Sequence, residues 1–115
     1  MSKKDQIIRE LVQFNGHREF NVQETMQQLR HFGGMRLLSW GLHNAFNLAN
    51  RGLKFTVNGN HHKGDVLIVL DASDTYTVFI LNLRGRVLDK YEQVYFDDLF
   101  DIIDERIEKI EEYVH

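Results

Sequence analysis

Basic and aromatic side chains alternate between residues 30 and 63, a combination that could bind single-stranded nucleic acid. Cationic side chains neutralise phosphates, and exposed rings stack on bases with little sequence preference. The candidate residues for this interaction are Arg30, Arg36, Trp40, Arg51, Lys54 and Lys63. Two considerations oppose it: the rings could belong to the core, and the isoelectric point near 6.0 is lower than that of most nucleic-acid-binding domains.

Histidine and carboxylate side chains form two groups that could bind a metal ion, but neither has the spacing of a known site. The group suited to a transition metal consists of His43, His61, His62 and Asp65. Adjacent residues of a strand or loop usually point apart, which separates such ligands. The group suited to calcium consists of Asp71, Asp74 and Thr75, without the acidic repeat and closing Glu of an EF-hand. We therefore expect no bound metal and no cofactor.

Catalytic motifs are also missing from the sequence. The chain has no cysteine, which excludes thiol catalysis, disulfides and thiolate metal sites. Ser39 and Ser73 lie outside any Gly-x-Ser-x-Gly motif, and Gly33-Gly34 does not begin a phosphate-binding loop. Several carboxylates near the C-terminus could do acid–base chemistry, but only if they were buried. They are Asp97, Asp98, Asp101, Asp104 and Glu105. We expect them to be exposed, and we predict no catalytic residue and no enzymatic activity.

Length and composition indicate one domain that spans residues 1–115. The chain is 43% hydrophobic and 27% charged, as in ordinary globular proteins. No signal sequence and no apolar run of about 20 residues is evident, so we expect a cytoplasmic protein without membrane association. Residues 1–64 hold nine Lys/Arg and four Asp/Glu, whereas residues 65–115 hold five and thirteen. These parts could attract each other in the fold, or the basic part could bind an anionic partner.

Helices are predicted at both ends of the chain. The first two span residues 3–14 and 22–31, and their capping pairs are Ser2 with Asp5 and Asn21 with Glu24. The last spans residues 97–114. Its apolar stripe consists of Leu99, Ile103, Ile107, Ile110 and Val114.

Strands are predicted between these helices, over residues 35–40, 53–57, 66–70, 75–83 and 87–94. Residues 42–50 fit helical and strand spacing alike, and we expect a bent or bulged strand there. The apolar run 66–70 indicates a central strand covered on both faces. Asn58-Gly59 is a hairpin signal whose loop we expect to extend to Gly64, and Arg84-Gly85 is a tight turn. Short connections of this kind favour antiparallel pairing. The predicted fold is α+β: an antiparallel sheet of about five strands, with two N-terminal helices and one long C-terminal helix packed on one face.

Several short motifs occur in a fixed order between residues 24 and 105. They are Gly33-Gly34, Gly52-Leu53-Lys54-Phe55-Thr56-Val57, Asp74-Thr75-Tyr76 and Val94-Tyr95-Phe96-Asp97-Asp98-Leu99. In this order they resemble a group of small uncharacterised proteins of bacteriophages and integrated mobile elements. Residues 1–20, with the N-terminal helix, lie outside the resemblance. It implies the α+β fold and a mobile-element origin, and it assigns no activity and no site residue.

These observations predict an accessory or protein-interaction domain without enzymatic activity. An amphipathic helix at either end, or an edge strand of the sheet, could bind a partner protein or form a homodimer with a second copy. The alternative is a single-stranded nucleic-acid-binding module that uses the basic region 30–63.

Overall fold

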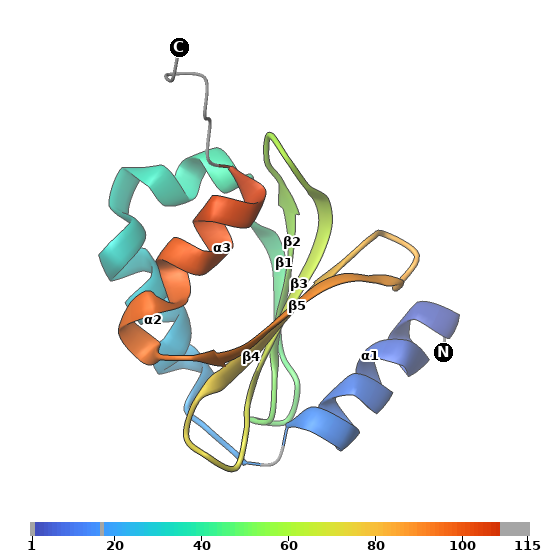
Figure 1. The fold of residues 1–115 in the computed structure, drawn as a ribbon. Coiled ribbons are helices and arrows are strands. Elements are labelled where there is room, and N and C mark those ends of the chain that lie inside the picture. Colours follow the sequence, from blue (N-terminus) through green and yellow to red (C-terminus); the bar gives the residue numbers. More distant parts are fainter. Residues whose placement is uncertain (1, 17, 109–115) are drawn as a thin grey trace.

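The computed structural model describes residues 2–16 and 18–108 (Figure 1). In chain order its elements are α1 (Lys3–Asn15), α2 (Val22–Gly33), η1 (Gly34–Trp40), β1 (His43–Asn47), β2 (Leu53–Asn58), β3 (Lys63–Leu70), β4 (Tyr76–Leu81), β5 (Val87–Val94), η2 (Phe96–Asp98) and α3 (Leu99–Ile107). The strands form one antiparallel sheet in the order β1-β2-β3-β4-β5. The predicted α+β class with a five-stranded antiparallel sheet is confirmed.

The two N-terminal helices begin at the predicted caps. The side chain of Ser2 accepts a 3.1 Å hydrogen bond from the amide of Asp5, and Asn21 Oδ1 accepts one of 2.9 Å from the amide of Glu24. Each bond satisfies an amide that has no partner within the helix. α2 ends where Gly34 takes a φ of +52°, which residues with a side chain rarely adopt.

The helices cover both faces of the sheet, so the prediction that they all pack on one face is wrong for α1 (Figure 1). α1 packs Ile8 and Val12 against Leu67 and Val69. α2, η1 and α3 cover the opposite face, which includes Ile68. Successive side chains of a strand point to opposite faces, and the continuous apolar run of β3 therefore makes both faces apolar. Both then need a cover, and β3 is the buried central strand that the sequence predicted. We call the two sides the α1 face and the α2/α3 face.

Residues 35–40 belong to a 3₁₀-helix, and the prediction of a strand there is wrong. η1 follows α2 directly. Met35 and Leu38 are 80% and 73% exposed, whereas Leu37 and Trp40 pack against the core. Leu37 and Trp40 are three residues apart, which places them on the same side of a 3₁₀-helix. The apolar residues of this segment thus follow a three-residue period instead of the alternation of a strand.

The predicted bulged strand within residues 42–50 is confirmed as β1. His43 pairs with Thr56 and Phe46 pairs with Lys54, so β1 contains one residue more than β2 between the two pairs. Asn44, inside this bulge, has a φ of +53°, a conformation that asparagine tolerates better than most residues.

The C-terminal helix is preceded by one turn of 3₁₀-helix, η2, and begins at Leu99 instead of the predicted residue 97. Leu99, Ile103 and Ile107 are buried against the sheet, as their spacing predicted. Ile110 and Val114, the other members of the stripe, lie outside the described residues.

Candidate functional site

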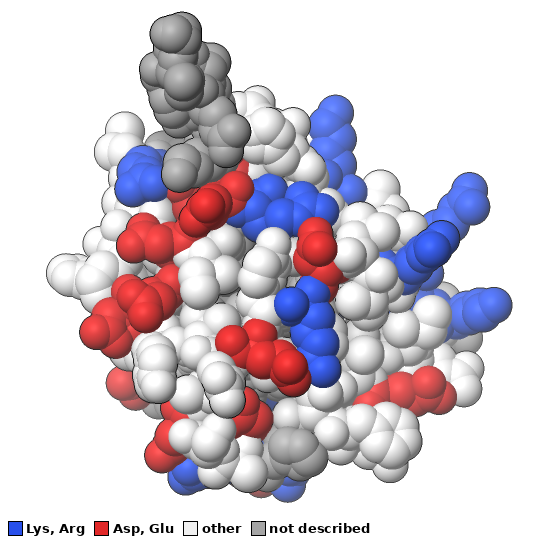
Figure 2. All heavy atoms as spheres, viewed as in Figure 1, with Lys and Arg blue, Asp and Glu red and all other residues white. Residues whose placement is uncertain are grey.

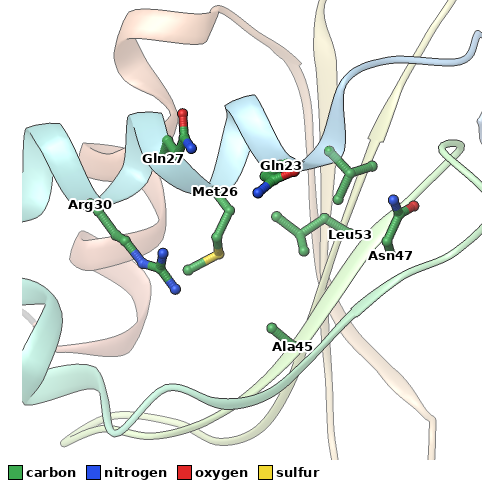
Figure 3. A pocket seen from close by; sticks show the side chains of 8 residues that line it. Gln23, Met26, Gln27, Arg30, Ala45, Asn47 and Leu53 are labelled. Atoms are coloured by element: carbon green, nitrogen blue, oxygen red, sulfur yellow. The ribbon is translucent and has the colours of Figure 1, made fainter.

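A groove runs between α2 and the edge strand β1 on the α2/α3 face (Figure 3). Its volume is about 340 Å³, and it is lined by Val22, Gln23, Met26, Gln27, Arg30, Ala45, Asn47 and Leu53. Met26 and Leu53 are buried and form an apolar floor. The bulge in β1 turns Ala45 and Asn47 toward α2, because Phe46 points to the other face beside Lys54.

The groove continues past Met26 and Arg30 toward η1. A second hollow of about 230 Å³ is lined by Met26, Arg30, Leu37, Leu38, Gly41 and Leu42. Since Met26 and Arg30 line both hollows, the two form one elongated depression along α2, which we call the α2–β1 groove. Leu38, strongly exposed, extends the apolar surface at this end.

Arg30 is the charged residue of the α2–β1 groove. Its side chain extends from α2 toward β1 (Figure 3). The guanidinium makes no ion pair and no hydrogen bond within residues 2–16 and 18–108. The other polar side chains that line this hollow are amides, those of Gln23, Gln27 and Asn47. A guanidinium without a partner beside an apolar floor is suited to a carboxylate, which it can hold through two parallel hydrogen bonds.

The strand that borders the groove is an edge of the sheet without charged side chains. Native proteins commonly place charges on edge strands, since the free backbone groups there would pair with other chains. β5, the opposite edge, carries Asp89, Lys90 and Glu92. β1 has the sequence His-Asn-Ala-Phe-Asn, and all five residues are exposed. Residues 45–47, beyond the bulge, therefore offer backbone hydrogen-bonding groups directly beside the groove.

The sheet separates the residues that the sequence suggested for nucleic-acid binding. Arg30 and Arg36 belong to α2 and η1, on the α2/α3 face. Lys54 and Lys63 lie on the α1 face, as the alternation along β2 and β3 requires. Arg51 lies in the β1–β2 turn, with its guanidinium 3.7 Å from Glu19. The six candidates therefore do not form one surface.

Trp40, the sixth candidate, is a core residue. It is fully buried and stacks on Phe100 at 4.9 Å between ring centroids. Its Nε1 donates a 2.8 Å hydrogen bond to Oδ1 of Asp104, which also accepts from Arg36. The expectation that Trp40 stacks on a base is thus wrong, because no face of its ring reaches solvent. The prediction that all the carboxylates of residues 97–105 are exposed is wrong for Asp104, since η1 covers it.

Two of the four residues proposed as transition-metal ligands, His43 and Asp65, have separate partners. His43 Nδ1 lies 2.7 Å from the carbonyl oxygen of Gly41. Asp65 lies on the α1 face, where it accepts a 2.8 Å hydrogen bond from Thr56 and forms a 2.6 Å ion pair with Lys4. In the part of the chain that the structure describes, no three His, Asp or Glu side chains are close enough to share a metal ion.

The aspartates proposed as calcium ligands stabilise the β3–β4 turn. Asp71 Oδ1 accepts hydrogen bonds from the amide and the hydroxyl of Ser73, at 2.9 and 2.7 Å, and Oδ2 accepts one of 2.9 Å from Thr75. Burial by itself raises the pKa of Asp71, but these hydrogen bonds outweigh it and lower the pKa below 3.8. Asp74 forms an ion pair with Arg18. The group therefore has the local contacts expected of an Asx turn.

The chain matches no protein-family model, no curated protein and no solved structure. Among the helices of the described residues, none has the length and apolar character needed to span a membrane.

Sequence reasoning did not find the α2–β1 groove. A weak signal was present, because Gln23, Gln27 and Arg30 recur at helical spacing beside the apolar Met26 and so form a polar border on α2. The other wall depends on Ala45, whose direction is set by the bulge in β1 and by the packing of α2 on the sheet.

Proposed function

We propose that this chain is a non-enzymatic protein-interaction domain that binds an extended, acidic peptide segment of a partner protein in the α2–β1 groove. One observation carries the proposal: Arg30, without a partner among the described residues, lies over an apolar floor beside an uncharged edge strand. An accessory role in a phage or mobile element, which the motif order suggests, is part of the same proposal.

The chemistry of the groove supports a peptide as its occupant. Met26 and Leu53 would receive an aliphatic side chain, and Arg30 would pair with a carboxylate of the same segment. The backbone groups of residues 45–47 would pair with the backbone of the segment, as in other cases of strand addition to a sheet edge.

The absence of enzymatic activity is proposed because three aspartates that could do acid–base chemistry have structural partners. Asp104 holds Trp40 and Arg36, Asp65 pairs with Lys4, and Asp71 stabilises its own turn. A carboxylate engaged in this way is not positioned to exchange protons with a substrate.

The proposal is tested with a random library of linear peptides selected on the purified chain. Enriched peptides should combine an aliphatic residue with a nearby Asp, Glu or C-terminal carboxylate. Their affinity is then measured by fluorescence anisotropy. Ala45→Arg, which places a long charged side chain in the groove, should abolish binding, and Arg30→Gln should weaken it about fivefold or more.

Arg18→Gln is the matched control, because it removes the same charge from a surface ion pair with Asp74, and neither residue lines the groove. It should bind like the wild type. Failure to enrich any peptide, or equal binding by Ala45→Arg, would exclude the groove as a peptide site. Sedimentation equilibrium showing a dimer that Ala45→Arg dissociates would instead assign the groove to a second copy of the chain, and the peptide proposal would be wrong.

A further inference from the structure

Basic side chains from three segments meet at one end of the α1 face. Lys3 and Lys4 belong to the first turn of α1, Lys63 begins β3, and Arg84 and Arg86 lie in the β4–β5 turn. Two contacts join the segments. A Cβ placed on Gly85 would lie 3.3 Å from Cα of Lys4, and Lys4 Nζ lies 2.6 Å from Asp65 Oδ2. Asp65 and Lys63 are two residues apart on the same face of β3.

Most of this positive charge has no counter-charge. Lys4 pairs with Asp65, but the side chains of four exposed residues make no ion pair with any described residue: Lys3, Lys63, Arg84 and Arg86. We call these four the basic end. Asp5 is two positions after Lys3 and so points about 200° away around the helix. Acidic side chains instead gather over α3 on the other side of the molecule, whereas Lys and Arg project beside the N-terminal part of α1 and the β4–β5 turn (Figure 2).

The β4–β5 turn holds its two arginines in a defined backbone conformation. Oδ1 of Asn82 accepts hydrogen bonds from the amides of Arg84 and Arg86, at 2.9 and 3.0 Å. The carbonyl of Asn82 accepts a further 3.0 Å bond from Gly85. Ordering these residues would therefore cost little entropy when an anionic ligand binds.

An exposed aromatic ring lies on the same face of the sheet. Phe46 is 56% exposed, and Lys54 Nζ lies 5.4 Å from its ring centroid. Phe46 pairs with Lys54 on β2, and four residues further along β2, Asn58 pairs with Lys63 of the basic end. Four strand residues span about 13 Å. The distance along the sheet between the Phe46 ring and Lys63 of the basic end is therefore one that a few nucleotides can span.

We infer that the α1 face binds single-stranded nucleic acid, with phosphates at the basic end and one base stacked on Phe46. Cationic groups beside an exposed aromatic ring of a sheet are the combination by which proteins hold single strands. The inference concerns a different surface from the α2–β1 groove. It keeps Lys54 and Lys63 of the sequence-based candidates, and it replaces the others with residues from α1 and the β4–β5 turn.

The test is fluorescence anisotropy with a mixed-sequence DNA strand of about 12 nucleotides and the corresponding RNA, at about 20 and 200 mM salt. Binding should weaken as salt rises. Arg84→Gln and Arg86→Gln should each reduce the slope of log affinity against log salt by about 0.7. Phe46→Ala should weaken binding about fivefold or more with an unchanged slope. Arg18→Gln, which removes one charge from the opposite end of the sheet, should match the wild type.

Two further probes distinguish nucleic acid from other polyanions. Polyglutamate and vesicles containing phosphatidylserine should compete weakly, because neither supplies a base for Phe46. The inference is wrong if no strand binds at low salt, if Arg84→Gln and Arg86→Gln bind like the wild type, or if vesicles or polyglutamate bind better than the strand while Phe46→Ala has no effect.

Discussion

The indole Nε1 of Trp40 donates a 2.8 Å hydrogen bond to Oδ1 of Asp104, and this bond joins η1 to α3. Both side chains are buried, with 0% and 6% of their surface exposed. Phe100, one helical turn before Asp104, stacks on the indole. The Trp40–Asp104 bond and the ring stack, together with the bond from Arg36 to the same carboxylate, hold the short η1 segment to the core.

Replacement of Asp104 by alanine should lower the free energy of unfolding by about 2 to 3 kcal/mol, since the indole N–H would stay buried without an acceptor. Chemical denaturation measures this change. Asp101→Ala, at an exposed position of the same helix, should change it by less than about 0.5 kcal/mol. Equal effects of the two substitutions would show that the Trp40–Asp104 bond does not stabilise the fold.

The ion pair between Lys4 and Asp65 fixes α1 on its face of the sheet. The carboxylate of Asp65 is completely buried, and Lys54 remains 3.9 Å away as a second cation. Lys4→Met should therefore lower the free energy of unfolding by about 1 to 3 kcal/mol, because a buried carboxylate loses its closest partner.

Hydrogen exchange distinguishes this local effect from general destabilisation. In Lys4→Met, the amides of α1 should exchange faster than those of α2 relative to the wild type. Lys3→Met is the matched control, since Lys3 is exposed in the same turn and makes no ion pair with a described residue. Uniform acceleration across both helices would contradict a specific anchoring role for Lys4.

Stability should fall at acidic pH because of His62. Burial, and secondarily the positive charge of Arg106, lower the pKa of its imidazole below 6.5, although hydrogen bonds with the backbone of Asp65 and Leu81 oppose this. Well above pH 6.5 the ring is neutral in both the folded and unfolded states. As the pH falls through 6.5, the unfolded chain takes up the proton first, and the folded state loses stability until its own, lower pKa is reached.

His62→Gln removes this titration and keeps a polar side chain. The drop in Tm between about pH 7.5 and pH 5.5 should be smaller in the variant than in the wild type. His43→Gln, at an exposed position, is the comparison and should retain the drop of the wild type. An identical pH dependence in His62→Gln would contradict the role assigned to burial.

Local sequence signals were sufficient for the elements whose determinants lie within a few residues. The capping pairs at Ser2 and Asn21 fixed the starts of α1 and α2, because a cap bonds to an amide three residues away. The Asn58-Gly59 turn and the apolar run of β3 likewise indicated neighbouring antiparallel strands and a central position. The segment of residues 35–40 was misassigned because a short apolar run fits more than one period.

For the candidate sites, the sequence indicated single residues but not how these residues are arranged in space. Arg30, Lys54 and Lys63 were recognised as cations that could bind a ligand, but the sheet places Arg30 on one side and both lysines on the other. Arg84 and Arg86 belong to the acidic part of the sequence, and the fold brings them beside the first turn of α1. Linear spacing contains no information on such distant neighbours.

By itself, the sequence determined the α-helices, the five strands of the sheet and their antiparallel pairing, but not η1, since caps, turns and apolar periods act over a few residues. Only the tertiary structure decided which face each helix covers, that Trp40 and Asp104 are buried together, and that α2 and β1 enclose a groove. These features depend on contacts between residues far apart in the chain. The position of each helix follows from the need to cover both apolar faces of the sheet in the same fold.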